Sequence, residues 1–227
     1  MNKILTTLMS MFTMKSTMKK TLSAVLFVSI SAVGIYWYTS APATLNTSAN
    51  TSANTSVIEL SRSMGSADAP IVLEEFSSLT CPHCATFHKS VYPDLIKKYV
   101  ETGKVRIEFK SFPLDNLALA ANLLALSLPK ENFFQFINHA LFYQDALFKA
   151  PKETLLEWSR RVGISQKDFE AIISDKDSAN AVQKNIILYQ KKYNIKGTPT
   201  VVINGVVVDK VEKETVFKAI EKALENL

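Results

Sequence analysis

The chain has 227 residues, enough to bury the core of one large domain or two small ones. Its formal net charge is +5, but four lysines lie among the first 43 residues, which contain no acid. The remainder is close to neutral and intersperses Lys and Arg with Asp and Glu, so the composition gives no sign of a nucleic-acid-binding protein.

Residues 1–43 have the pattern of an export signal. The lysines end at Lys20, an apolar run follows over 21–38, and Ala41-Pro42-Ala43 offers small residues at the −3 and −1 positions of a cleavage site. An uncleaved anchor is the alternative, because the run approaches the roughly 20 residues that span a bilayer and ends in aromatic residues suited to the membrane interface. We favour cleavage. In both cases the rest of the chain is exported, and an oxidising compartment suits a cysteine pair.

Residues 44–56 repeat a small polar unit of Asn, Thr, Ser and Ala without apolar periodicity, which predicts a flexible linker. Its Asn-Thr-Ser triplets match the glycosylation acceptor pattern, but such a repeat generates that pattern by chance. The folded part is expected to begin at about residue 57. A short strand is predicted at 57–60, and the apolar run over 71–76 predicts a second strand.

The only two cysteines, Cys81 and Cys84, lie directly after this second strand with Pro and His between them. Apolar residues then recur every three or four positions, which predicts a helix from Cys81 to about residue 99 with a kink at Pro93. At a helix N-terminus, unpaired backbone N–H groups and the helix dipole stabilise a thiolate. A thiolate beside a second thiol is the minimum apparatus for thiol–disulfide exchange.

Two other readings of the cysteine pair are weaker. An inert disulfide over so short a loop would remove little chain entropy and would stabilise the domain poorly. A zinc site usually needs four ligands; His88 is near enough in sequence to join the two cysteines, but no second Cys-x-x-Cys exists to complete the set. No metal is therefore expected.

Strand and helix patterns alternate in the rest of the chain. Alternation over 105–112 predicts a half-buried strand that pairs in parallel with the strand at 71–76, as in a βαβ unit. From 116 to 194 the pattern is helical, and its aromatic residues are interpreted as core. The five helices predicted there are centred on residues 117–128, 133–141, 155–158, 166–172 and 179–193, the fourth with Ser165 as its N-cap.

A second strand-rich stretch closes the chain. Asn204-Gly205 between two runs of β-branched residues, 200–203 and 206–208, predicts a hairpin with a type I′ turn. An amphipathic helix follows over 216–224. The order βαβ, helical block, ββα predicts an α/β core with a helical insertion over about 116–194, all within one domain from residue 57 to the C-terminus.

These residues together resemble a known family. Cys81-Pro82-His83-Cys84 after a strand, then a helical insertion, then Gly197-Thr198-Pro199-Thr200 opening a hairpin, resemble the thioredoxin fold and, more narrowly, the DsbA-like bacterial thiol–disulfide oxidoreductases. The resemblance covers residues 57 to the C-terminus. The N-terminal signal and linker also resemble those of exported bacterial members, which implies a periplasmic location.

The resemblance implies roles for four further residues of the chain. Thr198–Pro199 is expected to be a cis peptide beside the cysteines, where the backbone receives a substrate peptide. His83 is expected to donate a hydrogen bond or a positive charge to the Cys81 thiolate, lowering its pKa and making the disulfide oxidising. A solvent-facing spacer is the alternative for His83, and a trans proline at the start of an edge strand is the alternative for Pro199.

Glu75 is the last candidate. In thioredoxin-like proteins an acid at this spacing lies buried under the cysteine pair and helps to move protons to and from the second cysteine, because a buried carboxyl group has a raised pKa. On strand alternation alone, either Glu74 or Glu75 could instead point to solvent. His88 and His139 are interpreted as ordinary surface or core histidines.

The sequence therefore predicts an exported enzyme that introduces disulfide bonds into reduced substrate proteins through the Cys81–Cys84 pair, without a cofactor, and that an inner-membrane partner reoxidises. A disulfide isomerase or reductase is the near alternative. A periplasmic metal-handling or folding-helper protein is the alternative from another class: copper(I) suits thiolates, but no Met/His cluster lies near the motif to add ligands.

Overall fold

The computed structural model describes residues 60–227. The predicted signal or anchor at 1–43 and the predicted linker at 44–56 lie outside the described residues. Within 60–227, no helix combines the length and the apolar character that a membrane span requires.

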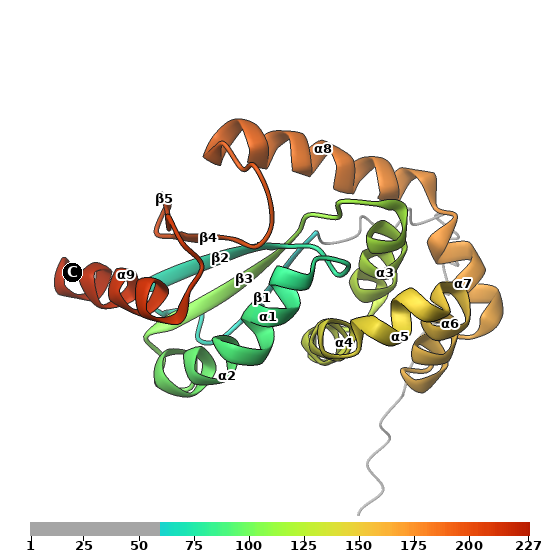
Figure 1. The fold of residues 1–227 in the computed structure, drawn as a ribbon, viewed down its shortest axis with the longest axis horizontal. Coiled ribbons are helices and arrows are strands. Elements are labelled where there is room, and N and C mark those ends of the chain that lie inside the picture. The colour runs from blue at the N-terminus through green and yellow to red at the C-terminus, as the bar shows by residue number, and fades with distance from the viewer. Residues whose placement is uncertain (1–59) are drawn as a thin grey trace, which may run out of the picture. The chain divides into compact units, whose positions relative to one another are not determined.

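A five-stranded mixed sheet forms the centre of the described chain, with the strand order β1-β3-β2-β4-β5 (Figure 1). β2 and β3 pair in parallel, as predicted from the βαβ pattern, and every other pair is antiparallel. The strands are β1 (Ser61–Met64), β2 (Ile71–Ser77), β3 (Val105–Ser111), β4 (Thr200–Ile203) and β5 (Val206–Val207).

The first strand lies later in the chain than predicted. Leu60, the only described residue of the predicted strand at 57–60, is not in a strand, and β1 begins at Ser61. The sequence of β1, Ser-Arg-Ser-Met, lacks the apolar alternation that identifies strands. This edge strand instead buries Arg62, whose guanidinium donates to the carbonyl of Leu126 at 2.8 Å and lies over the ring of Phe133.

The helix after the cysteines is divided into shorter pieces. α1 (Pro82–Ser90) is followed by α2 (Tyr92–Leu95) and by the π-helical turn η1 (Ile96–Val100). The break at Val91 precedes Pro93, which has no N–H to continue the helical hydrogen-bond ladder, so the predicted disruption at this proline is confirmed.

The segment 116–194 folds into six helices, one more than predicted. The extra helix is α5, which has only six residues and therefore shows no complete amphipathic repeat. Ser165 accepts a hydrogen bond from the backbone N–H of Asp168, which confirms the predicted N-cap. The helices are α3 (Asn116–Ser127), α4 (Lys130–Phe142), α5 (Gln144–Lys149), α6 (Pro151–Arg161), α7 (Gln166–Ile173) and α8 (Lys176–Tyr193).

Helices cover both faces of the sheet. α1, α2 and α9 (Lys213–Glu225) pack on the face that carries Leu73, while α8 crosses the other face, where Tyr189 contacts the ring of Phe76 (Figure 1). Helices α3 to α7 gather beside the end of the sheet at which β2 leads into α1 (Figure 1). The cysteines therefore lie where the sheet, α1 and the helical insertion meet.

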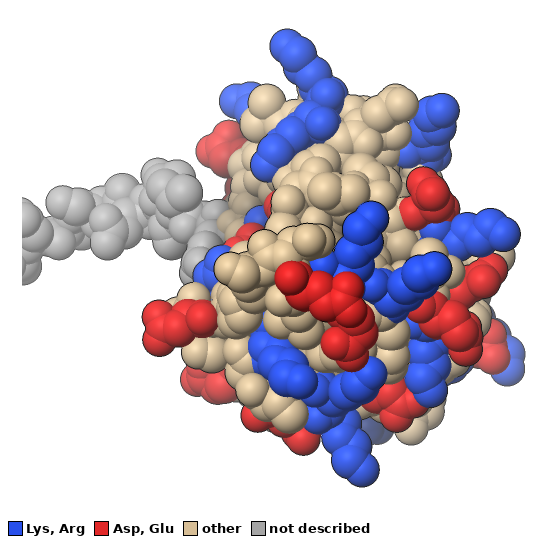
Figure 2. Space-filling model, turned by 90° about the vertical axis from the view of Figure 1, so that its left-hand side faces the viewer, with Lys and Arg blue, Asp and Glu red and all other residues tan. Residues whose placement is uncertain are grey.

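The β4–β5 hairpin has the predicted turn. Asn204 and Gly205 both have positive φ, 46° and 85°, as a type I′ turn requires. Figure 2 shows the side of the molecule that carries α9, where positive and negative side chains are interspersed over the surface. This face offers no continuous basic stripe for a nucleic-acid backbone.

Candidate active site

Cys81 occupies the N-cap position of α1. Its backbone is extended, and Pro82 follows at the first helical position, where a missing N–H costs nothing and the fixed φ of proline suits the helix. Both cysteines are free thiols. Cys81 keeps 6% of its surface exposed and Cys84 none, so Cys81 is the sulfur that an attacking or accepting group can reach.

The surroundings of Cys81 favour its thiolate. The pKa of Cys81 is lowered to about 5, chiefly by a hydrogen bond from the Cys84 thiol, with further contributions from the Thr198 side chain and from the backbone N–H groups of Cys84 and His83. Partial burial acts in the opposite direction. At neutral pH this sulfur is therefore an ionised nucleophile.

Thr198 comes to Cys81 from 117 residues away in the chain. The Cys81 thiol donates a hydrogen bond to the carbonyl oxygen of Thr198, with 3.2 Å between sulfur and oxygen. The Thr198 hydroxyl is buried without a partner among residues 60–227 while Cys81 is a thiol, so it is free to donate to the sulfur once the proton leaves. The Thr198–Pro199 peptide bond is cis, as the family resemblance implies.

Cys84 has the opposite character. Its pKa is raised far above the ordinary value, first by burial and then by the hydrogen bond that its thiol donates to Cys81. Smaller contributions from the Ser77 side chain and the Ser78 backbone N–H oppose this rise. The pair thus consists of a reactive thiolate and a protonated, inaccessible partner.

His83 lies on the surface of α1. Its side chain is exposed and makes no hydrogen bond within the described part of the chain, whereas its backbone N–H contributes to lowering the pKa of Cys81. The predicted action of its imidazole on the thiolate stays a prediction.

Glu75 is fully buried, on the sheet face that α1 covers. Its Oε1 atom lies 2.8 Å from Nε2 of His88, and Nδ1 of His88 lies 2.8 Å from Oδ1 of Asn138 on α4. Glu74 points to the other face of the sheet, which settles the ambiguity left by strand alternation. The partnership of His88 escaped the sequence analysis, although its spacing of four residues from Cys84 on one helix is the signal that could have suggested it.

The loop before Cys81 is held by the helical insertion. Gln144, the first residue of the unpredicted helix α5, is buried, and its amide donates to the carbonyl oxygens of Leu79 and Cys81 at 2.9 and 3.0 Å. The Thr80 hydroxyl donates to Asp115, the N-cap of α3, at 2.6 Å. These contacts fix the backbone that carries the nucleophilic sulfur.

Replacing Gln144 with leucine is expected to raise the pKa of Cys81. The variant leaves the Leu79 carbonyl without its partner and loosens the loop, at a cost of about 1–3 kcal/mol in the free energy of unfolding. The pH at which iodoacetamide labelling of Cys81 is half maximal should therefore move upward. Asn122→Leu is the matched control, because this buried amide donates only within its own helix, to Ala118. An equal pKa of Cys81 in both variants would contradict the positioning role of Gln144.

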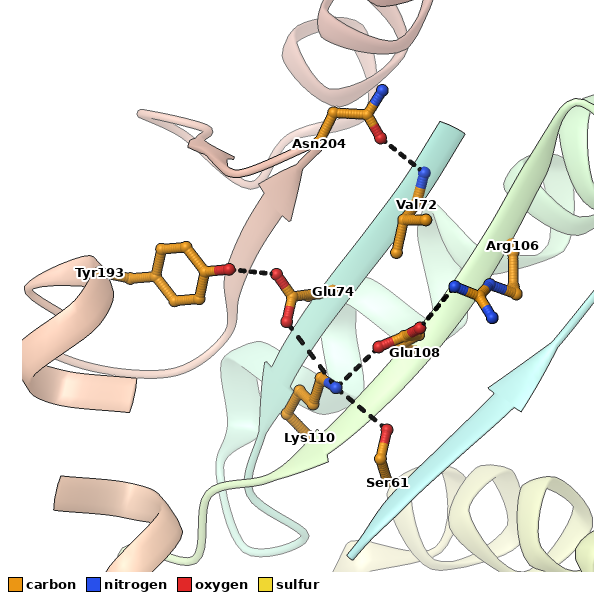
Figure 3. Close-up of polar contacts among 8 residues, drawn as sticks. All are labelled: Ser61, Val72, Glu74, Arg106, Glu108, Lys110, Tyr193 and Asn204. Atoms are coloured by element: carbon orange, nitrogen blue, oxygen red, sulfur yellow. Dashed lines mark hydrogen bonds and ion pairs between the residues drawn. The ribbon is translucent and has the colours of Figure 1, made fainter. Parts of the chain in front are cut away.

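A second set of contacts fixes the loop that carries Thr198. Figure 3 shows Tyr193, the last residue of α8, donating to Glu74 at 2.5 Å, and Lys110 lying between Glu74 and Glu108. The amide oxygen of Asn204 accepts from the backbone N–H of Val72 at 2.8 Å (Figure 3). The segment between α8 and β4 is thus tied to β2 on both sides.

Two open grooves flank the Thr198–Pro199 turn. One, of about 810 Å³, lies between α1 and the segment before α9, and its lining includes His83, Phe87 and Pro199. The other, of about 650 Å³, lies between the end of α8 and the hairpin and is lined by Ile195 and Thr198 among others. An extended peptide placed along this turn would pass the Cys81 sulfur.

The geometry fits thiol–disulfide exchange. It unites a nucleophilic sulfur, a buried second thiol, and backbone and side-chain groups that stabilise the thiolate. Within residues 60–227, no three His, Cys, Asp or Glu side chains lie close enough together to hold a metal ion.

Comparisons with known proteins agree with this arrangement. A thioredoxin family model matches residues 58–222. A Rickettsia prowazekii protein, named as a candidate protein-disulfide oxidoreductase, is 32% identical over 167 residues, covering 72% of this chain and 61% of that protein. The chain thus spans less than two thirds of that relative. Disulfide bond formation protein D of Bacillus subtilis is 24% identical over 178 residues, covering 72% of this chain and 77% of that protein.

Solved structures show the same fold. The crystal structure of alpha-DsbA1 from Wolbachia pipientis is 26% identical, has a TM-score of 0.67, and is matched over 73% of this chain and 92% of that one. Oxidised BdbD from Bacillus subtilis, 22% identical with a TM-score of 0.63, is matched over 74% and 95% of the two chains and shares the fold. The predicted thioredoxin fold with a helical insertion is confirmed, and the chain belongs to the thioredoxin family, as one of its DsbA-like members.

Proposed function

We propose that this protein is a thiol–disulfide oxidoreductase that donates the Cys81–Cys84 disulfide to reduced substrate proteins. The observation that carries the proposal is the unequal pair of thiols: Cys81 reaches the surface with its pKa lowered to about 5, and Cys84 is buried with its pKa raised. The enzymatic assignment is also supported by the names of the related proteins.

The reaction begins with the oxidised pair. A substrate thiolate attacks Sγ of Cys81, the Cys81–Cys84 bond breaks, and Cys84 leaves with the electron pair and takes up a proton. The second substrate thiol then loses its proton and attacks the mixed disulfide, and Cys81 leaves as a thiolate. Two electrons pass from the substrate to the protein. Cys81 is the better leaving group because its thiolate is stabilised.

The lowered pKa of Cys81 favours an oxidase over a reductase or isomerase. Whatever stabilises the thiolate stabilises the reduced protein, and about 1.4 kcal/mol of such stabilisation raises the reduction potential by about 30 mV. The Thr198 hydroxyl and the backbone N–H of His83 act in this direction. We also propose that the imidazole of His83 donates a hydrogen bond or a positive charge to the same sulfur.

Substrates are proposed to bind along the Thr198–Pro199 turn, in the grooves on either side of it. Exposed apolar side chains on the insertion and just before it supply a further contact for unfolded chains, because the insertion borders the cysteine loop through Gln144. These are Leu114, Phe142, Tyr143 and Phe148.

The N-terminal sequence and the family resemblance support a proposal for the location and the redox partner of the protein. We propose that residues 1–43 export the protein to the periplasm as a cleaved signal or as an anchor, and that 44–56 serve as a linker to the domain over 57–227. Reduced exported proteins would then be its substrates, and an inner-membrane partner would accept electrons from the reduced pair.

The equilibrium reduction potential of the full chain against glutathione tests the direction of the reaction. We expect a value well above the roughly −270 mV of thioredoxin and closer to the roughly −120 mV of a strong oxidant. The oxidised chain should also transfer one disulfide to a reduced, unfolded test protein. A potential at or below that of thioredoxin would assign the protein to the reductases instead.

A further inference from the structure

A buried chain of polar groups runs from the sheet to the insertion. Glu75 on β2 contacts His88 on α1, and His88 contacts Asn138 on α4, with 2.8 Å between the paired atoms in both contacts. Neither Glu75 nor His88 has measurable side-chain exposure. The strand neighbours of Glu75 are Phe109 and Val201, both apolar and buried, so this carboxyl group depends on His88 for its polar contact.

The contacts of His88 fix how many protons the pair holds. Oδ1 of Asn138 can only accept a hydrogen bond, so Nδ1 of His88 carries a hydrogen. Nε2 then faces Oε1 of Glu75, and one proton must lie between these two atoms. With the proton on the nitrogen, the pair is an imidazolium facing a carboxylate. With the proton on the oxygen, it is a neutral imidazole facing a carboxylic acid. The pair is neutral as a whole in both forms.

The second carboxyl oxygen of Glu75, Oε2, is available to accept a proton. Oε2 is buried and has no hydrogen-bond partner among the described residues, and the same holds for the hydroxyl groups of Ser77 and Tyr92. Ser77 shares the α1-facing side of β2 with Glu75 and interacts with the Cys84 sulfur. Cys84 and His88 are one turn apart on α1, about 6 Å along the helix axis. Ser77 and Glu75 are two residues apart on β2, which is a similar distance along the strand. The Cys84–Ser77 and His88–Glu75 pairs can therefore face each other at the same spacing.

The titratable groups around His88 are few. Tyr92 stacks on its ring, with 4.2 Å between ring centroids, and burial first and the nearby Glu75 second raise the pKa of this phenol. Cys84 lies one turn away on the same helix. Beyond Asn138, the charged groups Lys130 and Glu131 of α4 line a surface pocket of about 450 Å³ that the Asn138 side chain also lines.

We infer that His88 is a positioning residue that holds Glu75 as the proton acceptor and donor for Cys84. The inference rests on the proposed function, because it concerns the step in which Cys84 gains or loses its proton. In the form with the shared proton on Nε2, the imidazolium places a positive charge beside the carboxylate, and Asn138 holds the ring of His88 at Nδ1.

Cys84 gives up its proton when the reduced pair is reoxidised. The Cys81 thiolate first attacks one sulfur of oxidised glutathione, the glutathione disulfide bond breaks, and one glutathione leaves as a thiolate while the other stays in a mixed disulfide with Cys81. Cys84 then loses its proton to Oε2 of Glu75, through the hydroxyl of Ser77, while His88 keeps its own proton and its charge. The Cys84 thiolate attacks Sγ of Cys81, the Cys81–Cys84 bond forms, and glutathione leaves as a thiolate with the electron pair. Glu75 finally gives up this proton, which passes to solvent, and the carboxylate is restored.

The two steps can be measured separately in one experiment. The reduced full chain is mixed with excess oxidised glutathione between pH 5 and 9, quenched with acid, and resolved by mass spectrometry into reduced, mixed-disulfide and oxidised forms. In His88→Gln the first step should stay within about twofold of the wild type, because Cys81 does not use the pair. The second step should slow by about tenfold or more at pH 7.

The pH profile separates proton transfer from a structural effect. Without the pair, Cys84 must lose its proton to hydroxide, so the second step of His88→Gln should rise by about tenfold per pH unit, more steeply than in the wild type. His139→Gln is the matched control, since this histidine contacts Tyr143 and Trp158 and not Glu75. It should behave as the wild type.

Two outcomes would overturn the inference: an unchanged second step in His88→Gln, or a slower one with the wild-type pH slope. Failure of the wild type to form a mixed disulfide at Cys81 would instead overturn the proposed function. Should His88→Gln not fold, nitrogen NMR of the wild-type chain decides. Nδ1 of His88 should carry a hydrogen throughout this pH range, and an unprotonated Nδ1 would refute the proton count.

Discussion

Cys81→Ser should lose all disulfide transfer, whereas Cys84→Ser should still attack disulfides and then stop at the mixed disulfide. The difference follows from exposure and ionisation. Cys81 is the sulfur at the surface and has its pKa lowered to about 5, while Cys84 is fully buried and protonated. Incubation of each variant with oxidised glutathione, followed by mass spectrometry, distinguishes them: the glutathione adduct should accumulate only in Cys84→Ser.

The rate of alkylation gives the size of the effect. At pH 6, lowering a thiol pKa from about 8.5 to about 5 raises the thiolate fraction about 300-fold. The intrinsic nucleophilicity falls by roughly 30- to 40-fold over the same change. Cys81 should therefore react with iodoacetamide about tenfold faster than an ordinary cysteine at pH 6, and its rate should be flat above that pH.

A matched pair of variants tests the main cause of this low pKa. The Cys84 thiol donates the hydrogen bond that contributes most to it. Serine at position 84 keeps a donor and alanine does not, so the half-maximal pH of Cys81 labelling should be higher in Cys84→Ala than in Cys84→Ser. Labelling of Cys84 before Cys81 in the folded wild type would contradict the assignment of the nucleophile.

The features that the sequence predicted well depend on residues close together in the chain. The strand before the cysteines, Cys81 at the helix start, and the Asn204-Gly205 turn follow from local patterning and turn chemistry. The parallel pairing of β2 and β3 followed from the βαβ pattern. Thr198 and Pro199 were placed beside Cys81 only through family resemblance, since no local pattern relates positions 117 residues apart.

The groups that surround the cysteines were mostly beyond sequence analysis. Alternation could not decide between Glu74 and Glu75, because their faces are distinguished only by what packs on them: His88 on one side and Tyr193 on the other. Gln144 was missed with its short helix. Each of these contacts depends on tertiary packing of residues between 13 and 119 positions apart.

The reduced protein should be more stable than the oxidised protein at neutral pH, and the difference should shrink steadily as the pH falls from about 8 to about 5. The folded pKa of Cys81, about 5, lies below its unfolded value of about 8.5. Between these values the unfolded reduced chain binds one more proton than the folded chain, so the stability of the reduced form rises with pH. The oxidised form has no thiols, and the other titrating groups largely cancel in the difference.

The pKa values also set the size of this stability difference and its dependence on pH. Each pH unit between 5 and the unfolded pKa corresponds to about 1.36 kcal/mol, and solvent at the exposed edge of Cys81 reduces the change from pH 5 to pH 7 to about 2 kcal/mol. For a domain of this size that is roughly 4–8 °C in Tm.

Above about pH 8.5 the trend should reverse, because both unfolded thiols are then ionised while Cys84, with its raised folded pKa, still binds a proton. Thermal unfolding of the reduced and oxidised chains from pH 4 to pH 9.5 tests this, and a gap in Tm that does not depend on pH between 5 and 8 would mean that Cys81 is not held as a thiolate in the folded protein.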